Sequence, residues 1–432
     1  MLIAGSAKVK ITPPIGIPLD GYSSRTEPSK GIHDDLHARA LILSNGKEYI
    51  ALASLEILYS RYDITQRVRK ILNEELAIPE DNILVAAIHT HSGPSILGFH
   101  SVNKRYFVKE YLSLLPGLIS SAFIKAFNSL QEVRLCYGKG KVNGWTINRR
   151  KPLKGHLDNE VIAIKLENKK GKTVSSIVNF TCHAVVLGPN NLLISADYPG
   201  YVSITIERIE GGVCLFFNGA CGDINPLTPG TIIERVYDRS VGTFSDVIKM
   251  GRSIAGEALK IMNSAQPEEV STLKALRQEV KLKLRIPPIP SDNELDEMRE
   301  RYNALLNQGK EIEAKKLKRE IMKVELVKNL LSLHPGGELR TEVQVIRIGN
   351  IVLVALPGEP FVDIGLRIKS QSKAELTMIV GYANDVIGYV PTCKAYEEGG
   401  YEVSFPVCII EKGSDETLVN AALNLIENIL SE

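Results

Sequence analysis

The feature that most constrains the fold is the alternation of apolar, strand-like runs with helical patterns in the first half of the chain. Residues 49–58 and 82–88 have the composition of strands, and residues 63–76 between them follow a helical period. Such alternation predicts an α/β layered fold with a mixed sheet, formed by a single domain of residues 1–432. Further strands are predicted at residues 132–137, 161–166, 174–180, 213–217, 341–348, 351–356 and 376–380.

One segment differs from the rest in composition. Residues 292–331 are rich in Glu, Lys, Arg and Leu, and their apolar positions recur with a helical period. Asn307-Gln308-Gly309 interrupts this period, so we predict a charged helical hairpin inserted at about residues 291–333. The hairpin has two interpretations, a cap or dimer contact and a solvated insertion, and the second is the more common use of such a helical face. A homo-oligomer therefore stays possible.

The charges of the chain do not indicate a charged partner. The 52 basic and 50 acidic residues are spread along the sequence, which argues against binding to nucleic acid or an anionic membrane. No stretch is expected to reach the length needed to span a bilayer, and the opening residues lack a secretory pattern. The expected location is therefore cytoplasmic.

Polar segments follow several predicted strands, where active sites gather in α/β sheets. His89-Thr90-His91 follows the strand at residues 82–88, and in an extended backbone both imidazoles would lie on one side. On this evidence a metal or catalytic site is about as well supported as a pair of structural histidines. His183 follows the strand at residues 174–180, where a lone histidine is more often structural than functional.

Two more polar segments that follow predicted strands complete the set of candidate site segments. The loop at residues 218–226 contains Gly219 and Gly222, which permit close backbone approach and free amides for an oxyanion, although a simple tight turn explains them too. Glu359 follows the strand at residues 351–356 and suits a ligand or a charge at a helix N-terminus. Two histidines and one carboxylate are a suitable set for catalytic zinc with an open position for water. The motifs of serine α/β-hydrolases, zincins and P-loop proteins are absent.

These segments together resemble the neutral, non-lysosomal ceramidase family. The resemblance extends over nearly the whole chain, and its most specific element is His-Thr-His-Ser-Gly-Pro. The matching segments are Gly31-Ile32-His33, His89-Thr90-His91-Ser92-Gly93-Pro94, Ile147-Asn148-Arg149, Asn218-Gly219-Ala220-Cys221-Gly222-Asp223, Pro357-Gly358-Glu359 and the region from Tyr389 to Glu402.

The resemblance implies a ligand set and roles for residues around it. In the family one zinc ion is bound by the first histidine of the pair, a second histidine, a glutamate and a tyrosine. The resemblance also implies that His91 transfers protons beside the zinc and that Arg149 and Tyr401 hold the substrate carbonyl. The ligands carried over to this chain are His89, His183, Glu359 and Tyr389.

The chain departs from the family pattern at Asn225, where the family has a serine. A serine nucleophile is absent at this position, but water activated by zinc can attack an amide, and we expect the Asn225 amide to contact the substrate. The predicted function is a zinc-dependent hydrolase that cleaves the amide bond of an N-acyl lipid or related N-acyl compound. The alternatives are a metallohydrolase of another amide or an ester, and a non-catalytic lipid- or metabolite-binding relic.

Overall fold

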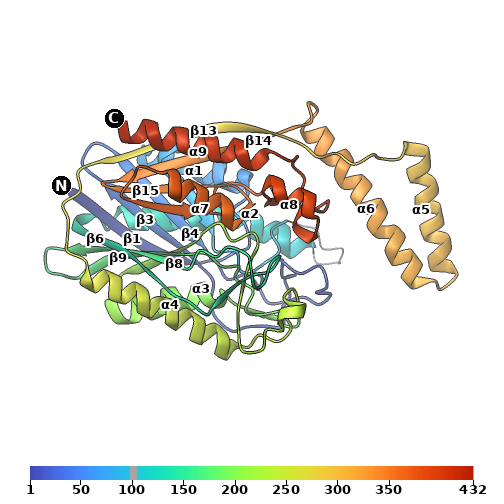
Figure 1. The fold of residues 1–432 in the computed structure, drawn as a ribbon, viewed down its shortest axis with the longest axis horizontal. Helices are drawn as coiled ribbons and strands as arrows, with labels where there is room; N and C mark the ends of the chain where they lie inside the picture. Colours follow the sequence, from blue (N-terminus) through green and yellow to red (C-terminus); the bar gives the residue numbers. More distant parts are fainter. Residues whose placement is uncertain (98–104, 432) are drawn as a thin grey trace.

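A mixed eight-stranded sheet forms the centre of the protein in a computed structural model, which describes residues 1–97 and 105–431 (Figure 1). The pairs β4–β5 and β9–β11 are parallel and the other neighbours are antiparallel, so the predicted mixed α/β sheet is confirmed. The order of the strands is β11 (Val213–Asn218), β9 (Thr173–Phe180), β8 (Glu160–Asn168), β6 (Gln131–Lys141), β1 (Leu2–Lys10), β3 (His37–Ser44), β4 (Tyr49–Leu55) and β5 (Ile83–Ala87).

A second, four-stranded sheet packs face to face on the first. Side chains alternate between the two faces of a strand, so Leu41 and Leu52 of the first sheet meet Ile346 and Leu353 of the second in one buried cluster. The order in this second sheet is β13 (Leu273–Lys283), β14 (Glu338–Ile348), β15 (Ile351–Ala355) and β17 (Leu376–Val380).

Helices cover the two outer faces of this pair of sheets. Figure 1 shows α9 on one side of the sheets and α4 on the other, which gives four layers in the order helix, sheet, sheet, helix. The first sheet is covered by α1 (Tyr62–Leu76), α2 (Arg105–Phe127), α3 (Asp197–Glu210) and α4 (Phe244–Ser264), and the second by α7 (Val362–Gln371) and α9 (Ser414–Ser431).

Helix α2 corrects the expectation that no stretch of the sequence reaches the length needed to span a bilayer. Its stretch Phe107–Phe127 is long and apolar enough to cross a membrane, by length and composition alone. The same helix packs on β1 and β3 through Leu115, Ile119 and Phe123, which are fully buried. The core helix of a water-soluble domain meets the same criterion, so this finding is weak evidence for a membrane span.

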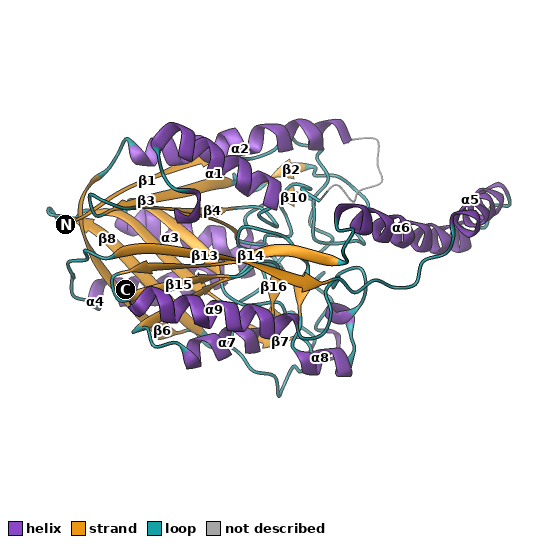
Figure 2. Cartoon of the chain, turned by 90° about the horizontal axis from the view of Figure 1, so that it is seen from above, coloured by secondary structure: helices purple, strands orange, loops and turns teal. Residues whose placement is uncertain are grey.

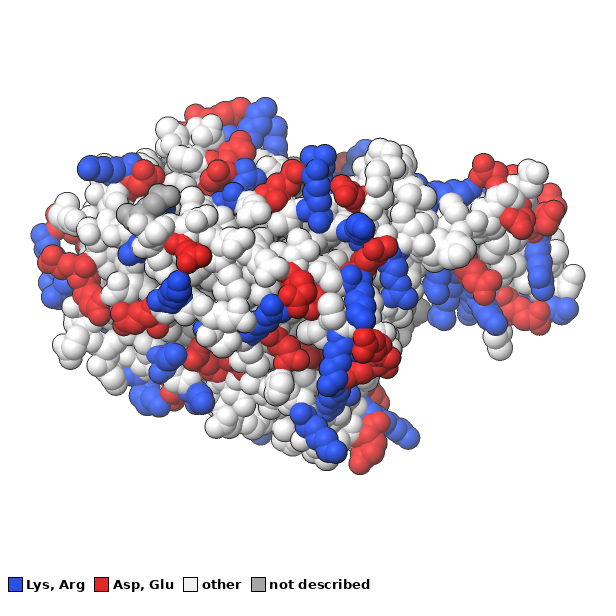
Figure 3. Space-filling model, turned by 45° about the horizontal axis from the view of Figure 1, so that its top comes forward, with Lys and Arg blue, Asp and Glu red and all other residues white. Residues whose placement is uncertain are grey.

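The charged insertion forms the predicted helical hairpin between β13 and β14. Its helices α5 (Asp292–Asn307) and α6 (Glu311–Leu333) project from the body (Figure 2). Helix α5 begins with a capping box, in which Ser291 and Glu294 satisfy each other's main-chain amides. Acidic and basic side chains are interspersed along the hairpin and over the adjoining face of the body (Figure 3). The small core between its two helices contains Leu295, Ile321 and Val324.

Short strand pairs extend the fold beyond the two large sheets. The parallel pair β16–β18 sets Glu359 beside Tyr389, and the antiparallel pair β7–β12 sets Asn225 opposite Ile147. These pairs place residues from distant parts of the sequence next to each other. The short elements are β2 (Gly31–Ile32), β7 (Thr146–Asn148), β10 (Leu193–Ile194), β12 (Ile224–Pro226), β16 (Glu359–Pro360), β18 (Tyr389–Val390), α8 (Cys393–Glu398) and the 3-10 turns Glu80–Asn82, Ile233–Arg235 and Tyr401–Val403.

Candidate functional site

Curling of the large sheet brings two of the predicted site segments together. Strands β5 and β11 are at opposite edges of the sheet, yet β11 also contacts β4 and β5, and the Ser54 hydroxyl donates to the Phe216 carbonyl across this contact. The segments that leave β5 and β9 therefore meet at one end of the sheet. Thr90 and Ala184 form a parallel bridge there, and the His91 amide donates to the Ala184 carbonyl.

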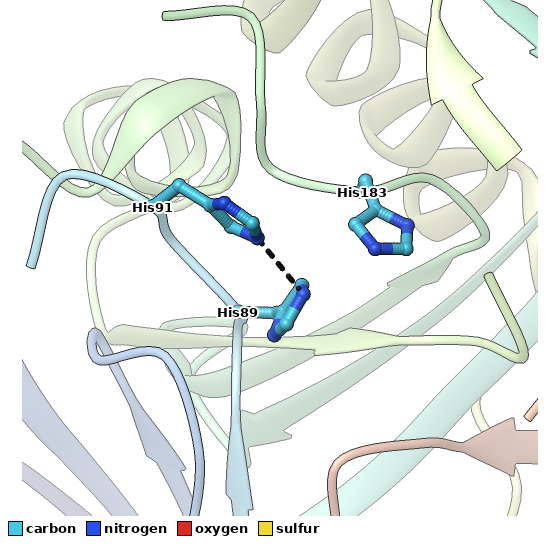
Figure 4. A group of neighbouring side chains, drawn as sticks. All are labelled: His89, His91 and His183. Atoms are coloured by element: carbon cyan, nitrogen blue, oxygen red, sulfur yellow. Dashed lines mark hydrogen bonds between the residues drawn. The ribbon is translucent and has the colours of Figure 1, made fainter. Parts of the chain in front are cut away.

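Three histidines converge at this point (Figure 4). One nitrogen from each of His89, His91 and His183 lies within 4.8 Å of the others, and all three residues are buried. The backbone at His89 has a φ of 65°, so the His89-Thr90-His91 segment is not the regular extended strand that the sequence analysis assumed. The two imidazoles nevertheless point toward each other, with 3.1 Å between their Nε2 atoms.

The main chain fixes the proton position in two of the imidazoles. His89 Nδ1 lies 2.9 Å from the Leu58 carbonyl, and His183 Nδ1 lies 2.6 Å from the Cys221 carbonyl. Because a carbonyl only accepts hydrogen bonds, both Nδ1 atoms carry a proton, and each ring, when neutral, presents a lone pair at Nε2. Burial, with help from the Arg149 charge, lowers the pKa of His183 to about 4, so its ring is neutral near pH 7. This is the form in which histidine binds metals.

Glu359 adds a carboxylate oxygen to these two nitrogens. Its Oε2 lies 3.1 Å from His183 Nε2 and 3.4 Å from His89 Nε2. Burial favours a raised pKa for Glu359, but the charge and hydrogen bonds that His89 and His183 supply whenever they carry an Nε2 proton outweigh burial and hold the pKa well below its ordinary value. When both imidazoles are neutral and Glu359 is ionised, three lone-pair atoms face one point, an arrangement that a cation would stabilise. Two imidazole nitrogens and one carboxylate oxygen are the donor set of many catalytic zinc sites.

His91 differs from the other two histidines in its environment. With the His89 ring neutral, its Nε2 carries a lone pair, and His91 Nε2 is then the donor in the contact between them. Within the described part of the chain, His91 Nδ1 is buried without a hydrogen-bond partner, and Gly21 packs directly against this ring. Burial, followed by the neighbouring His89 and His183, lowers the pKa of His91 well below its ordinary value. The ring is therefore a neutral group with its proton directed at the cluster.

Tyr389 lies beside the cluster on β18. Its ring stacks against His183 with 6.4 Å between centroids, and its hydroxyl accepts a hydrogen bond of 2.9 Å from Arg149 Nη2. Burial raises the pKa of the Tyr389 phenol well above its ordinary value, while the Arg149 charge acts in the opposite direction. The structure thus gathers all four residues that the resemblance implied as ligands, together with His91, into one buried region.

Arg149 is held by several partners around its guanidinium. Its Nε donates to Glu402, its Nη2 to the Gly222 carbonyl, and its Nη1 to Asn225 Oδ1 at 3.2 Å. A second Nη1 contact, of 3.5 Å, is to His183 Nε2. The other four N–H groups of Arg149 donate to Glu402, Asn225, Gly222 and Tyr389. The Nη1–H that faces His183 is therefore the one that would become free if His183 bound a metal.

Tyr401 and Asn225 lie in contrasting environments. Tyr401 is 52% exposed, its ring lies 5.9 Å from that of Tyr389, and its hydroxyl makes no hydrogen bond with any other residue that the structure describes. The Asn225 side chain is buried, and it accepts from Arg149 and donates to the Val236 carbonyl at 3.1 Å. Tyr401 is thus available to a substrate, whereas both ends of the Asn225 amide already have partners in the protein.

The Gly-rich loop supports the site in a different way from that expected. The Gly219 amide donates to the Phe180 carbonyl and the Gly222 amide to the Pro360 carbonyl, so neither is free to bind an oxyanion. A Cβ at Gly222 would lie 2.5 Å from the Glu359 carbonyl, which explains why the position requires glycine. The loop therefore packs directly against the main chain of Glu359.

Three residues that support the cluster were not predicted from the sequence. Tyr59 donates to Glu359 Oε1, Tyr382 stacks on His89 with 4.0 Å between centroids, and the buried Glu402 accepts from Arg149 and Arg150. Tyr59 and Tyr382 each follow the end of a strand, as the identified segments do. Their position after a strand could therefore have marked both tyrosines as candidate site residues.

Comparison with known proteins identifies relatives over most of the chain. The neutral ceramidase of Pseudomonas aeruginosa is 24% identical over 88% of this chain and 65% of its own length, so the chain spans about two thirds of that relative. The neutral ceramidase of Mycobacterium tuberculosis is 23% identical over 88% of this chain and 70% of that protein.

Solved structures show the same fold. The crystal structure of neutral ceramidase from Pseudomonas aeruginosa matches 99% of this chain and 75% of that chain, with a TM-score of 0.74 and 21% identity. A structure described as ceramidase complexed with C2 matches all of this chain and 75% of that chain, with a TM-score of 0.77 and 20% identity. The N-terminal model of the neutral/alkaline non-lysosomal ceramidases matches residues 3–240. This match covers more than half of the sequence, and the chain therefore belongs to the neutral/alkaline non-lysosomal ceramidase family.

Proposed function

We propose that this chain is a zinc-dependent hydrolase that cleaves the amide bond of an N-acyl lipid or a related N-acyl compound. The observation that carries the proposal is the convergence of His89 Nε2, His183 Nε2 and Glu359 Oε2 within 3.1–3.4 Å contacts. The relatives named neutral ceramidases support an N-acyl lipid as the substrate class.

In this proposal one zinc ion is held by His89, His183, Glu359 and Tyr389. The donor set fits the ion because both imidazoles are fixed with a free Nε2 and because the carboxylate faces them. Bound zinc would supply a Lewis acid and would lower the pKa of a coordinated water toward neutrality. The other steps of the reaction belong to groups of the chain itself.

His91 is the proposed proton-transfer group. Its Nε2 proton is directed at His89 Nε2 and loses this acceptor when His89 binds the ion. The proton is then available to a reacting group on the open side of the cluster, and after it is given up the same Nε2 can accept one. A neutral imidazole within hydrogen-bond reach suits general acid–base catalysis.

Tyr401 and Arg149 are the proposed donors to the substrate carbonyl. The Tyr401 hydroxyl has no hydrogen-bond partner in the described residues, and its side chain is half exposed beside Tyr389. The Arg149 N–H that approaches His183 Nε2 at 3.5 Å is released when His183 binds the ion. Both donors would stabilise negative charge that develops on the carbonyl oxygen.

Asn225 determines which nucleophile the reaction uses. A carboxamide does not form an acyl intermediate, so the attacking group in this proposal is water. The same residue is the observation that favours the second candidate function, a family member that binds a lipid or metabolite without cleaving it.

The experiment that tests the proposal is a hydrolysis screen of the purified wild-type protein and Asn225→Ser, with zinc content measured in both. The substrates are ceramide and N-acyl amides of graded chain length. The expected result is that the wild type contains one zinc ion per chain and cleaves at least one N-acyl amide. A zinc-loaded wild type that cleaves nothing, beside a serine variant that gains ceramide hydrolysis, would show that the wild type is a binding relic.

A further inference from the structure

Three consecutive residues that follow β4 hold two of the proposed ligands. The His89 amide donates to the Ile57 carbonyl at 3.1 Å, and His89 Nδ1 donates to the Leu58 carbonyl at 2.9 Å. Tyr59 then donates from its hydroxyl to Glu359 Oε1 at 2.5 Å. A single short segment therefore fixes the backbone and ring of His89 and one oxygen of Glu359.

The Tyr59 contact divides the two oxygens of Glu359 between different partners. Oε1 accepts from Tyr59, whereas Oε2 faces His183 Nε2 and His89 Nε2. The Tyr59 ring lies 5.1 Å from the His89 ring and 6.4 Å from the Tyr382 ring, so aromatic neighbours limit its movement. The hydroxyl is held where it reaches Oε1 and not Oε2.

We propose that Tyr59 is a positioning residue that makes Glu359 a ligand through one oxygen, Oε2, by keeping Oε1 in a hydrogen bond. The inference rests on the proposed zinc site. A carboxylate can bind zinc through one oxygen or two, and a strong hydrogen bond to one oxygen favours the one-oxygen mode. One-oxygen binding keeps a coordination position open for water, which the proposed reaction requires.

The test uses Tyr59→Phe, which keeps the ring and removes only the hydroxyl. The matched control is Tyr111→Phe, because the Tyr111 hydroxyl on α2 is also buried and donates to the Ile11 carbonyl at 2.8 Å, outside the cluster. Zinc affinity is measured by competition with a chromophoric chelator. The visible absorption spectrum of the cobalt(II)-substituted protein reports the number and arrangement of ligands.

The expected result is that Tyr59→Phe weakens zinc binding by about 10–100-fold, as is typical when a partner of a metal ligand is removed. Its cobalt spectrum should also differ from that of the wild type, because Oε1 becomes free to bind, and Tyr111→Phe should change neither property. The cobalt spectrum is the deciding measurement. If the spectrum of Tyr59→Phe superimposes on that of the wild type, the inference is overturned.

Two further outcomes separate this inference from the proposed function. A folded wild-type protein that binds no zinc overturns the proposed metal site and the inference with it. If Tyr59→Phe does not fold, a crystal structure of the zinc-loaded wild type replaces it. Both Glu359 oxygens within bonding distance of the ion would then overturn the inference and leave the zinc site standing.

Discussion

Replacing His91 by alanine separates its proposed role from that of the neighbouring histidines. His89 and His183 are each fixed by an Nδ1–H bond to a main-chain carbonyl, as metal-binding histidines usually are. His91 lacks such a partner in the described part of the chain, and it directs its own Nε2 proton toward the cluster. We therefore expect His91→Ala to retain zinc and His183→Ala to lose it.

The size of the expected loss in turnover follows from the proposed role of His91 in proton transfer. Loss of a general acid–base group lowers turnover by about 10²–10⁴-fold, which corresponds to a barrier higher by about 2.7–5.4 kcal/mol at about 1.36 kcal/mol per tenfold change. Elemental analysis gives zinc per chain, and steady-state hydrolysis of the best N-acyl amide gives kcat. His156→Ala is the control, because His156 is exposed and pairs with Asp363 outside the cluster. Loss of zinc in His91→Ala would make His91 a ligand, and undiminished turnover would remove it from the mechanism.

Three other perturbations test separate parts of the structure. Asn225→Ser shortens a side chain that bridges two partners, so thermal unfolding should show a loss of about 1–3 kcal/mol while elemental analysis finds zinc retained; unchanged stability would contradict the bridge. Gly21→Ala places a Cβ 2.3 Å from His91 Nδ1 at a φ of +100°, so turnover should fall with zinc retained, and wild-type kinetics would refute this packing. Arg69→Met removes two hydrogen bonds to buried Glu342 and leaves Arg277 as its remaining partner, so urea unfolding should show a loss of about 1–3 kcal/mol, and unchanged stability would refute this. Burial raises the pKa of Glu342, but Arg69 and Arg277 together outweigh it and lower the pKa, so this stabilisation is complete above about pH 4.3 and declines as the pH falls further.

The strands predicted from the sequence are all present, because each is an apolar run whose pattern suffices to identify it. The strands absent from the prediction depend on tertiary partners. In β3, Arg39 is buried and would argue against a central strand, but it is paired with Glu56 and Glu207. Strand β13 alternates exposed charges such as Lys281 and Lys283 with apolar residues beside the charged insertion, and its long pairing with β14 stabilises it.

The individual site residues were easier to predict than their arrangement. His89, His183 and Glu359 each follow the end of a strand, which the sequence shows directly. Their convergence depends on the curling of the large sheet and on the pairing of β16 with β18, and no local pattern encodes either. Tyr59 is 300 positions away from Glu359, so its contact is visible only in the folded chain.

The measurement that tests the proposed zinc site most directly is anomalous diffraction at the zinc edge from crystals of the metal-loaded protein. We expect one strong peak per chain, about 2.0–2.2 Å from His89 Nε2, His183 Nε2 and Glu359 Oε2, and at a similar distance from the Tyr389 hydroxyl. A peak elsewhere in the protein, or no peak in crystals grown with excess zinc, would contradict it.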